Sequence, residues 1–307
     1  MTISIAIIGF GKIARDEHLP AIAANDDFRL AAVVAPGEDP VCGAPWFPDH
    51  GTMLAEIGEE LDAVAICTPP SVRAGIAHDA LAAGCGLLLE KPPAPTTMEA
   101  QSIIDDAKRN GLTAFTAWHS RHAPGVAPAR RHLSGSRIAC VDVRWCESVR
   151  KWHPGQDWVW EKGGFGVLDP GINALSIITA IVPQPLAIAA ARLEMPENRA
   201  TPIAAKASIA GVSGKVLFDW RQDEGETWHI RIETEDGRSV TLEDGGARLR
   251  CDGETLPLQP QAEYSSVYQA FAGAIAAGET GADLAPLELA EQILTIGRAE
   301  AVEPFFW

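Results

Sequence analysis

The first 117 residues alternate short apolar runs with segments of helical spacing. The apolar runs read ISIAIIG, RLAAVVA, DAVAICT, GLLLE and TAFTA, and amphipathic patterns fill the intervals near residues 12–25, 52–60, 71–84 and 96–111. Such alternation is typical of βαβ units, in which helices cover both faces of a parallel sheet. The pattern therefore predicts an α/β chain that begins with a doubly wound domain.

After residue 122 the apolar runs become longer and alternate with polar positions. Examples are RIACVDVRWCESV, PLAIAAARLEM, GKVLFDW and WHIRIETEDG, and we expect helices at 124–133, 171–182, 262–277 and 286–302. This alternation favours a mainly antiparallel sheet with one packed face and one wet face. We therefore expect two domains, a doubly wound domain over residues 1–122 and an α+β domain over residues 123–307.

Composition and charge narrow the classes of partner. The 307-residue chain is 47% hydrophobic and 21% charged, and its formal net charge is −16. A strongly negative field without a Lys/Arg cluster repels nucleic acid and anionic membrane surfaces. No apolar stretch approaches the length of a membrane span, and no basic leader precedes the first strand. We therefore expect a soluble, cytoplasmic protein with no nucleic-acid or membrane partner.

The cysteines give no sign of a disulfide framework or a metal site. The chain has six of them, with no C-x-x-C pair and no His-Cys ligand spacing, and several lie within apolar strand patterns. We interpret them as reduced core residues, and we expect no metal.

A glycine-rich turn follows the first predicted strand and opens a helix. It reads GFGKIA, that is Gly9, Phe10, Gly11, Lys12, Ile13 and Ala14. The first glycine permits a tight turn, the second lets a pyrophosphate approach the backbone, and a small third residue lets the helix pack on the strand. The pattern alone also fits a structural turn, but its place in a βαβ series favours dinucleotide binding.

The loops after the second and fourth strands bear on the cofactor. In the doubly wound fold the second strand ends beside the adenosine ribose, and here Ala35 and Pro36 stand there with no Arg or Lys between residues 30 and 72. A 2′-phosphate would lack a cationic partner, which favours NAD over NADP. The fourth strand ends in Cys67, Thr68, Pro69 and Pro70, which form either a rigid lip for the cofactor or a plain turn.

A lysine stands where the fifth strand ends. The run LLLEKPPAP delivers Glu90 and Lys91 at the carboxyl edge of the sheet, the edge at which open α/β sheets bind ligands. A solvated surface lysine is the alternative, but the preceding buried strand and the two following prolines favour a functional role. We expect Glu90 and Lys91 to contact the cofactor.

The second domain contains an irregular stretch, residues 145–176, that is rich in tryptophan and glycine. Tryptophan faces and polar groups together are suited to sugars, and Glu147 and His153 lie here; the alternative is a tryptophan-rich core loop. Asp169 precedes a proline, so it either caps a helix or faces a cleft together with Asn173, one turn further on.

Three motifs carry a resemblance to a known family. In their order and spacing, GFGKIA, LLLEKPPAP and GGFGVLDPGIN resemble the glucose-fructose oxidoreductase and inositol dehydrogenase family over essentially the whole chain. The longer stretches GKIARDEHLPAI, AWHSR, KWHPGQDWVWEKGGFGVLDPGINALSI and FDWR are similar to its subgroup of bacterial D-galactose and L-arabinose 1-dehydrogenases. The resemblance implies an N-terminal Rossmann domain and a second domain with a large open sheet. It also implies that this sheet forms subunit contacts, so that the protein is a homo-oligomer, namely a dimer.

The resemblance also implies an activity and roles for residues. It implies an NAD(P)-dependent aldose 1-dehydrogenase that oxidises C1 of a cyclic sugar to the aldonolactone, with Lys91 as a catalytic cation. The wider family usually has histidine where this chain, like the subgroup, has Asn173, which leaves Asp169 as the better proton acceptor. The Ser-Arg that the arabinose enzyme carries after the second strand is absent. Under this hypothesis the substrate-binding residues are His119, Glu147, Trp152, His153 and Trp228.

Two alternatives stay open. Some relatives are sugar-sensing regulatory proteins that bind NAD(P) without turnover, although the presence of both Lys91 and Asp169 argues against this class. An inositol or acyclic polyol dehydrogenase would differ in giving a product that is not a lactone.

Overall fold

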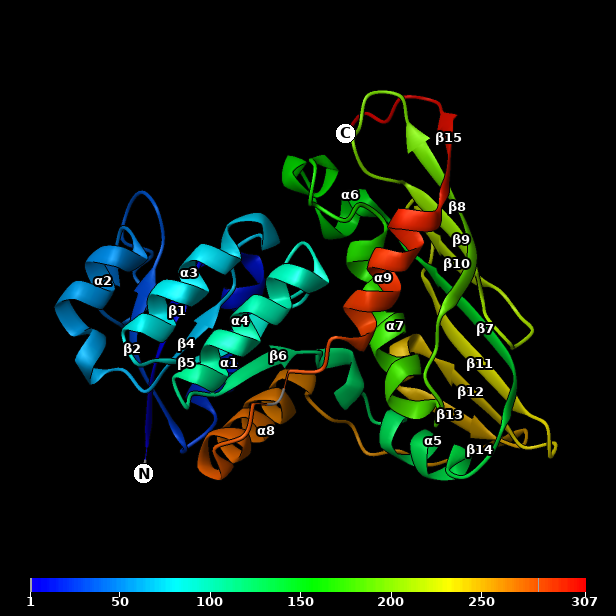
Figure 1. The fold of residues 1–307 in the computed structure, drawn as a ribbon, viewed down its shortest axis with the longest axis horizontal. Helices are drawn as coiled ribbons and strands as arrows, with labels where there is room; N and C mark the ends of the chain where they lie inside the picture. The colour runs from blue at the N-terminus through cyan, green and yellow to red at the C-terminus, as the bar shows by residue number, and fades with distance from the viewer. Residues whose placement is uncertain (1, 281) are drawn as a thin grey trace. The chain divides into compact units, whose positions relative to one another are not determined.

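The computed structural model describes residues 2–280 and 282–307, and the chain forms two compact units (Figure 1). Unit 1 comprises Met1–Trp118 and Glu263–Leu284, and unit 2 comprises His119–Ala262 and Ala285–Trp307. The change of unit after Trp118 lies close to the predicted boundary at residue 122. The later segment Glu263–Leu284, however, was predicted within the second domain and packs with unit 1.

Unit 1 contains a six-stranded sheet in which every strand pair is parallel. Its strand order is β3-β2-β1-β4-β5-β6, the order of dinucleotide-binding doubly wound folds, with the reversal between β1 and β4. All residues of β1 are buried, which requires cover on both faces of the sheet. The predicted doubly wound fold is confirmed. The strands are β1 Ile3–Ile8, β2 Phe28–Val34, β3 Trp46–Phe47, β4 Ala63–Ile66, β5 Gly86–Glu90 and β6 Ala114–Ala117.

The helices of unit 1 begin where the sequence offers capping residues. The Asp49 side chain accepts a hydrogen bond from the Thr52 N–H at the start of α2, and Thr96 caps α4 in the same way. Pro70 opens α3. The helices are α1 Leu19–Ala23, α2 His50–Ile57, α3 Pro70–Ala82, α4 Thr97–Arg109 and α8 Glu263–Ala277, with a π-helical turn η1 Ala14–His18 before α1 and a 3-10 turn η2 Gly58–Glu60 after α2.

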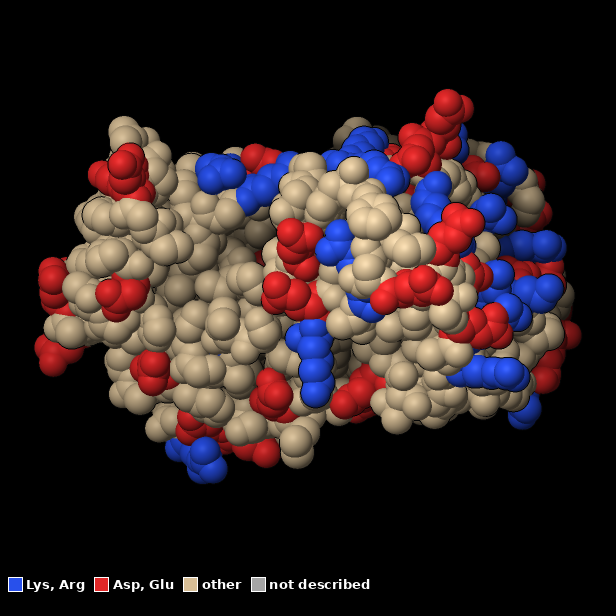
Figure 2. Space-filling view, turned by 90° about the horizontal axis from the view of Figure 1, so that it is seen from above, with Lys and Arg blue, Asp and Glu red and all other residues tan. Residues whose placement is uncertain are grey.

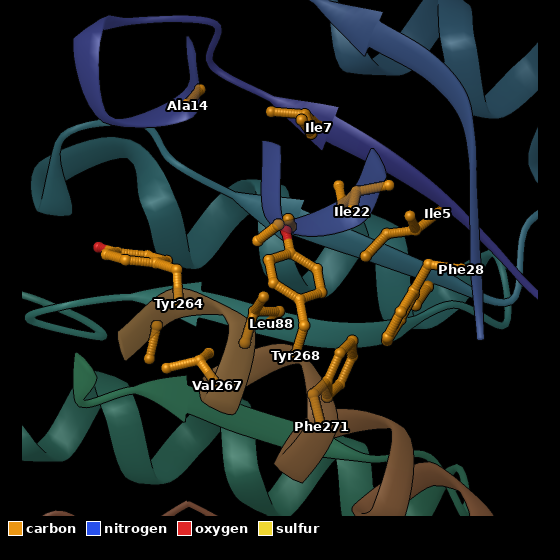
Figure 3. Packing of buried hydrophobic residues seen from close by; sticks show 14 of the residues in the cluster. Ile5, Ile7, Ala14, Ile22, Phe28, Leu88, Tyr264, Val267, Tyr268 and Phe271 are labelled. Atoms are coloured by element: carbon orange, nitrogen blue, oxygen red, sulfur yellow. The ribbon is translucent and has the colours of Figure 1, made fainter. Parts of the chain in front are cut away.

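Helix α8 completes the core of unit 1 although the sheet of unit 2 precedes it in the chain. Tyr264, Tyr268 and Phe271 are buried in one cluster with residues of β1, α1 and β2 (Figure 3). The ring of Phe28 meets Tyr268 edge-on, with centroids 5.1 Å apart, and stacks with Phe271. Large aromatic side chains of this kind supply much of a core's apolar burial. Helix α8 therefore belongs to unit 1.

Unit 2 is built on a nine-stranded sheet. Its order is β14-β13-β12-β11-β7-β10-β9-β8-β15; the pairs β7–β10 and β8–β15 are parallel and the others antiparallel, which confirms the predicted mainly antiparallel sheet. The strands are β7 Ile138–Cys146, β8 Ile188–Pro196, β9 Ala204–Ile209, β10 Val216–Asp219, β11 Thr227–Thr234, β12 Ser239–Glu243, β13 Arg248–Cys251, β14 Glu254–Thr255 and β15 Arg298–Val302.

Three longer helices of unit 2 lie against one face of this sheet (Figure 1). They are α5 Val126–Leu133, α7 Leu168–Ile181 and α9 Ala285–Ile296, and shorter turns are α6 Val149–Trp152, η3 His119–His122, η4 Asp157–Trp160 and η5 Asp244–Gly246. The predicted helix over 286–302 is wrong in its last six residues. The helix ends at Ile296 because Gly297 makes a close turn in which a Cβ would lie 2.7 Å from Leu193, and the chain then pairs with β8 as strand β15.

Among the described residues no helix is both long enough and apolar enough to cross a membrane. All six cysteines are outside disulfides, and burial raises the pKa of Cys85 to about 11. The buried thiols of Cys85 and Cys146 behave as small core hydrophobes, and the other four cysteines are half-buried.

Candidate active site

The glycine turn of unit 1 forms an open cradle at a helix N-terminus. Gly9 has a φ of 92°, and a Cβ there would lie 2.9 Å from the backbone nitrogen of Thr68, so only glycine fits between the ends of β1 and β4. A Cβ on Gly11 would meet nothing within 4 Å, so the space beside it is open. The helix begins at Lys12, and its N–H groups favour an anion. These residues fit the pyrophosphate of NAD or NADP.

The other predicted cofactor residues differ in what they can offer. The side chain of Phe10 is buried in the core, so only its backbone is available, and the Lys12 ammonium pairs with Asp16. Ile13 is exposed at the start of the helix. After β2, the Ala35 carbonyl accepts a hydrogen bond from the Trp46 indole, 3.0 Å away. Pro36 is exposed, and Cys67, Thr68 and Pro69 are half-buried or exposed where β4 ends.

Charge on unit 1 bears on the choice of cofactor. Unit 1 contains 7 basic residues (Lys and Arg) and 19 acidic residues (Asp and Glu). Unit 2 contains 18 basic and 22 acidic residues. Lys and Arg side chains gather over the sheet of unit 2 (Figure 2, right). An acidic unit 1 favours a cofactor with less negative charge.

Lys91 is half-buried directly after β5, and an arginine that sequence reasoning missed holds its segment. The side chain of Arg73, 2% exposed, donates hydrogen bonds to the carbonyl oxygens of Thr68, Glu90 and Pro92. One guanidinium thus ties the end of β4 to the residues on both sides of Lys91. Pro92 is itself buried, which further fixes the segment.

Glu90, predicted to bind the cofactor, has its carboxylate in the core of unit 1. Its Oε1 accepts a hydrogen bond from the Tyr264 hydroxyl at 2.5 Å and lies 2.9 Å from Nε2 of His18, and its Oε2 accepts from the Lys91 N–H at 2.8 Å. Nothing in the spacing of the sequence signalled this set, because its members are far apart in the chain.

In unit 2, Asp169 and His153 form a pair at the start of α7. Asp169 is 3% exposed, and its Oδ2 lies 3.2 Å from Nε2 of His153, whose Nδ1 lies 3.2 Å from the Gln156 side-chain oxygen. The N-cap position is Val167, without a side-chain cap, so the interpretation of Asp169 as a helix cap is wrong. A buried carboxylate against an imidazole is suited to moving a proton.

Asn173 lies one helical turn after Asp169 and is half-buried. Residues four apart share one face of a helix, so both side chains point from the same face of α7. Between them, a Cβ on Gly171 would lie 2.8 Å from the Phe218 ring, and α7 therefore rests directly on β10. The rigid sheet supports the first turn of this helix.

Glu147 and the neighbouring rings of Trp145, Trp228 and Trp152, here called the tryptophan ladder, lie at the end of β7. Glu147 is buried and accepts a hydrogen bond from the Trp228 indole at 2.9 Å. The Trp228 ring lies between those of Trp145 and Trp152, with centroids 5.9 Å from each. Trp152 is the exposed end of the ladder, and its indole donates to Glu226, a residue that sequence reasoning missed. The exposed ring could stack on a sugar face.

His119, the remaining predicted binding residue, begins η3 and is half-buried. Its Nδ1 lies 3.4 Å from the Ser120 hydroxyl, and Arg121 in the same turn donates to the Ser176 carbonyl of α7. The turn that carries His119 is thus attached to the helix that carries Asp169 and Asn173. Among the described residues no three potential ligands gather to hold a metal ion.

Comparison with known proteins places this geometry in context. A family model described as an oxidoreductase family with an NAD-binding Rossmann fold, GFO/IDH/MocA, matches residues 3–117. The galactose 1-dehydrogenase of Pseudomonas fluorescens is 39% identical over 99% of each chain. The inositol 2-dehydrogenase of Rhizobium meliloti is 26% identical over 53% of this chain and 50% of its own.

Solved structures agree with these relatives. The crystal structure of a D-galactose-1-dehydrogenase protein from Rhizobium etli superposes with a TM-score of 0.92 and 43% identity, covering 99% of this chain and 98% of that one. A 3-ketoreductase from Actinomadura kijaniata, solved with TDP-benzene and NADP, has a TM-score of 0.83 at 18% identity and covers 98% and 100%. The second likeness shows the shared fold.

Proposed function

Because the chain belongs to the GFO/IDH/MocA oxidoreductase family, we propose that it is an NAD(P)-dependent aldose 1-dehydrogenase. It would oxidise C1 of a cyclic sugar such as D-galactose or L-arabinose to the aldonolactone. The observation that carries this proposal is the full-length likeness to galactose dehydrogenases, because it includes unit 2, where the predicted sugar-binding residues lie.

The chemistry requires a proton acceptor and a cation. When bound, the nicotinamide supplies the acceptor for the hydride of C1. Asp169 removes the proton of the anomeric hydroxyl, and His153, 3.2 Å from its carboxylate, holds that carboxylate in place. The ammonium of Lys91 stabilises the negative charge that develops on the oxygen. Asn173, on the same face of α7, orients the hydroxyl.

The sugar ring is recognised by stacking and by paired polar groups. In this proposal the exposed Trp152 stacks on the C–H face of the sugar, and Trp228 supports it from behind. Glu147 and His119 bind ring hydroxyls. The Trp228 indole, 2.9 Å from Glu147, keeps that carboxylate in a fixed orientation.

We further propose NAD as the preferred cofactor and a cytoplasmic homodimer as the working form. The exposed Pro36 and the acidic unit 1 support the first point, because a 2′-phosphate needs a cation. The dimer would form through the face of the nine-stranded sheet opposite α5, α7 and α9. Six cysteines outside disulfides are compatible with a reducing compartment.

A substrate panel tests the proposal. Purified protein is mixed with D-galactose, L-arabinose, D-fucose, D-glucose, D-xylose or myo-inositol and with NAD or NADP, and absorbance at about 340 nm is followed while the product is analysed for a lactone. We expect growth of absorbance with at least one aldose, faster with NAD, and a lactone product. Cofactor and sugar binding without absorbance change would indicate a sensor, and turnover of inositol alone would indicate a polyol dehydrogenase.

A further inference from the structure

We propose that His18, held as an imidazolium between Glu90 and Tyr268, is a positioning residue for Lys91. The inference rests on the proposed function for the role of Lys91, but the geometry lies entirely within unit 1. In this arrangement the charged imidazole holds Glu90 ionised, and the Glu90 carboxylate holds the backbone of Lys91.

The contacts form one continuous chain from His18 to Lys91. His18 is 0% exposed; its Nδ1 lies 2.8 Å from the Tyr268 hydroxyl and its Nε2 lies 2.9 Å from Glu90 Oε1. The other carboxylate oxygen of Glu90 accepts the Lys91 N–H at 2.8 Å. The Glu90 carboxylate is buried, and a buried carboxylate requires a charged or hydrogen-bonding partner. His18 supplies such a partner to Oε1 of Glu90.

The local backbone explains how His18 reaches Glu90. His18 is the last residue of the π-helical turn η1, and such widened turns often occur at functional sites. The preceding Ala14 and following Ala21 and Ile22 are buried, so the same face of this segment delivers the imidazole into the core. Helix α8 closes the pocket from the other side with Tyr264 and Tyr268, whose rings meet the imidazole edge-on.

The charge on His18 follows from its neighbours. The titratable groups that face it are Glu90 of β5, Cys67 after β4, and Tyr264 and Tyr268 of α8. Burial by itself lowers the pKa of His18, but Cys67, Tyr268 and Glu90 outweigh it and raise that pKa well above the ordinary value. Burial also raises the pKa of Tyr268 to about 12, so this hydroxyl keeps its proton where His18 titrates.

The free energy of unfolding should depend on pH in a range in which His18 titrates. Because the pKa of His18 is raised in the folded state, protonation of His18 stabilises the fold. This stabilisation is complete below the pKa of histidine in the unfolded chain, about 6.5, and is lost as the pH rises through the pKa of His18 in the folded state. The cysteines and tyrosines with raised pKa values begin to contribute only near their unfolded values of about 9 and 10. A decline that begins above about pH 6.5, below the range in which these cysteines and tyrosines contribute, therefore reports His18.

The test compares the wild type with His18→Gln, which keeps a donor but cannot carry charge. His50→Gln is the matched control, because His50 lies 2.9 Å from Asp79 in an exposed pair of the same unit. We expect His18→Gln to lower kcat by about 10- to 100-fold, while the KM for sugar and the Kd for NADH change less than about threefold. The wild-type kcat should fall at alkaline pH, and that fall should be absent in His18→Gln.

A measurement without substrate separates this inference from the proposed function. With 15N-lysine labelling the chain gives few signals, because it has seven lysines, and Lys91→Arg identifies the Lys91 amide. In the wild type the shift of this amide should change over the pH range in which the urea midpoint falls, and in His18→Gln neither should change. A Lys91 amide insensitive to pH, or a kcat of His18→Gln equal to that of His50→Gln, would overturn the positioning role. Absence of turnover in the wild type would count against the proposed function alone.

Discussion

At the scale of single residues, Asp169 shows how the structure separates a capping role from a chemical one. An Asp before Pro fits an N-cap by sequence, and only the observed start of α7 at Leu168 removes that interpretation. Its partner His153 lies 16 positions earlier in an irregular stretch, where periodicity gives no guide to contacts. The residue types needed for proton transfer could be predicted, but their pairing could not.

Replacing Asp169 by Asn tests its proposed role as the base. The amide has the same shape and keeps a contact for His153, but it cannot accept the proton, so we expect kcat to fall by about 10²- to 10⁴-fold with a small change in melting temperature. Steady-state kinetics and thermal unfolding measure the two quantities, and Asn173→Ala serves as a comparison with an expected smaller loss. If Asp169→Asn keeps most of its kcat, His153 is the better candidate for the base.

The buried charged or polar residues that hold the segment around Lys91 could not be predicted from a single sequence. Lys91 could be proposed from its place after a strand and before two prolines. Arg73 and His18 could not, because each lies in an amphipathic helical pattern whose residues give no sign that a charged side chain points inward. Charged groups are rarely buried without partners, and those partners become visible only when distant segments meet.

At the scale of elements, hydrophobic periodicity predicted most strands and helices, and it failed where tertiary pairing decides the outcome. The residues of β15 were predicted as the end of a helix, but pairing with β8 makes them a strand. The short strands β3 and β14 have two residues each and leave no periodic pattern. The glycine turn was the opposite case, because backbone geometry itself demands glycine there.

The two glycines of that turn should respond differently to substitution. Gly11→Val places its side chain in open space, so the fold should persist while the valine blocks the pyrophosphate; we expect the NADH affinity to fall at least about tenfold. Gly9→Ala forces a Cβ against Thr68 at a φ of 92°, so we expect it to lower the free energy of unfolding by about 1–3 kcal/mol. Fluorescence titration with NADH and urea unfolding distinguish the two. Full NADH affinity in Gly11→Val would contradict the proposed cradle.

At the scale of the whole molecule, the return of α8 to unit 1 is the feature that sequence patterns could least predict. A boundary near residue 122 follows from the change in strand pattern, and the structure places the change of unit after Trp118. Membership of residues 263–284 in unit 1 depends on contacts such as Tyr264 with Glu90, which are 174 positions apart. Periodicity identifies the buried face of a helix, but it does not say which sheet that face covers.

The outer face of the nine-stranded sheet provides a test of the proposed dimer. A shallow hollow of 250 Å³ on this face is lined by Arg144, Leu217 and Asp219, with Leu217 half-buried among charged groups. If a second copy covers the hollow, Leu217→Glu removes an apolar contact and buries an added charge in the interface. Burying a charge costs free energy, so the variant should separate the subunits. Ala127→Glu adds the same charge on the exposed side of α5 and should leave the assembly unchanged.

Sedimentation velocity should therefore give twice the chain mass of 32.7 kDa for the wild type and for Ala127→Glu, and the single chain mass for Leu217→Glu. A wild type that sediments as one chain would exclude the dimer, and a Leu217→Glu variant that stays dimeric would move the interface to another surface.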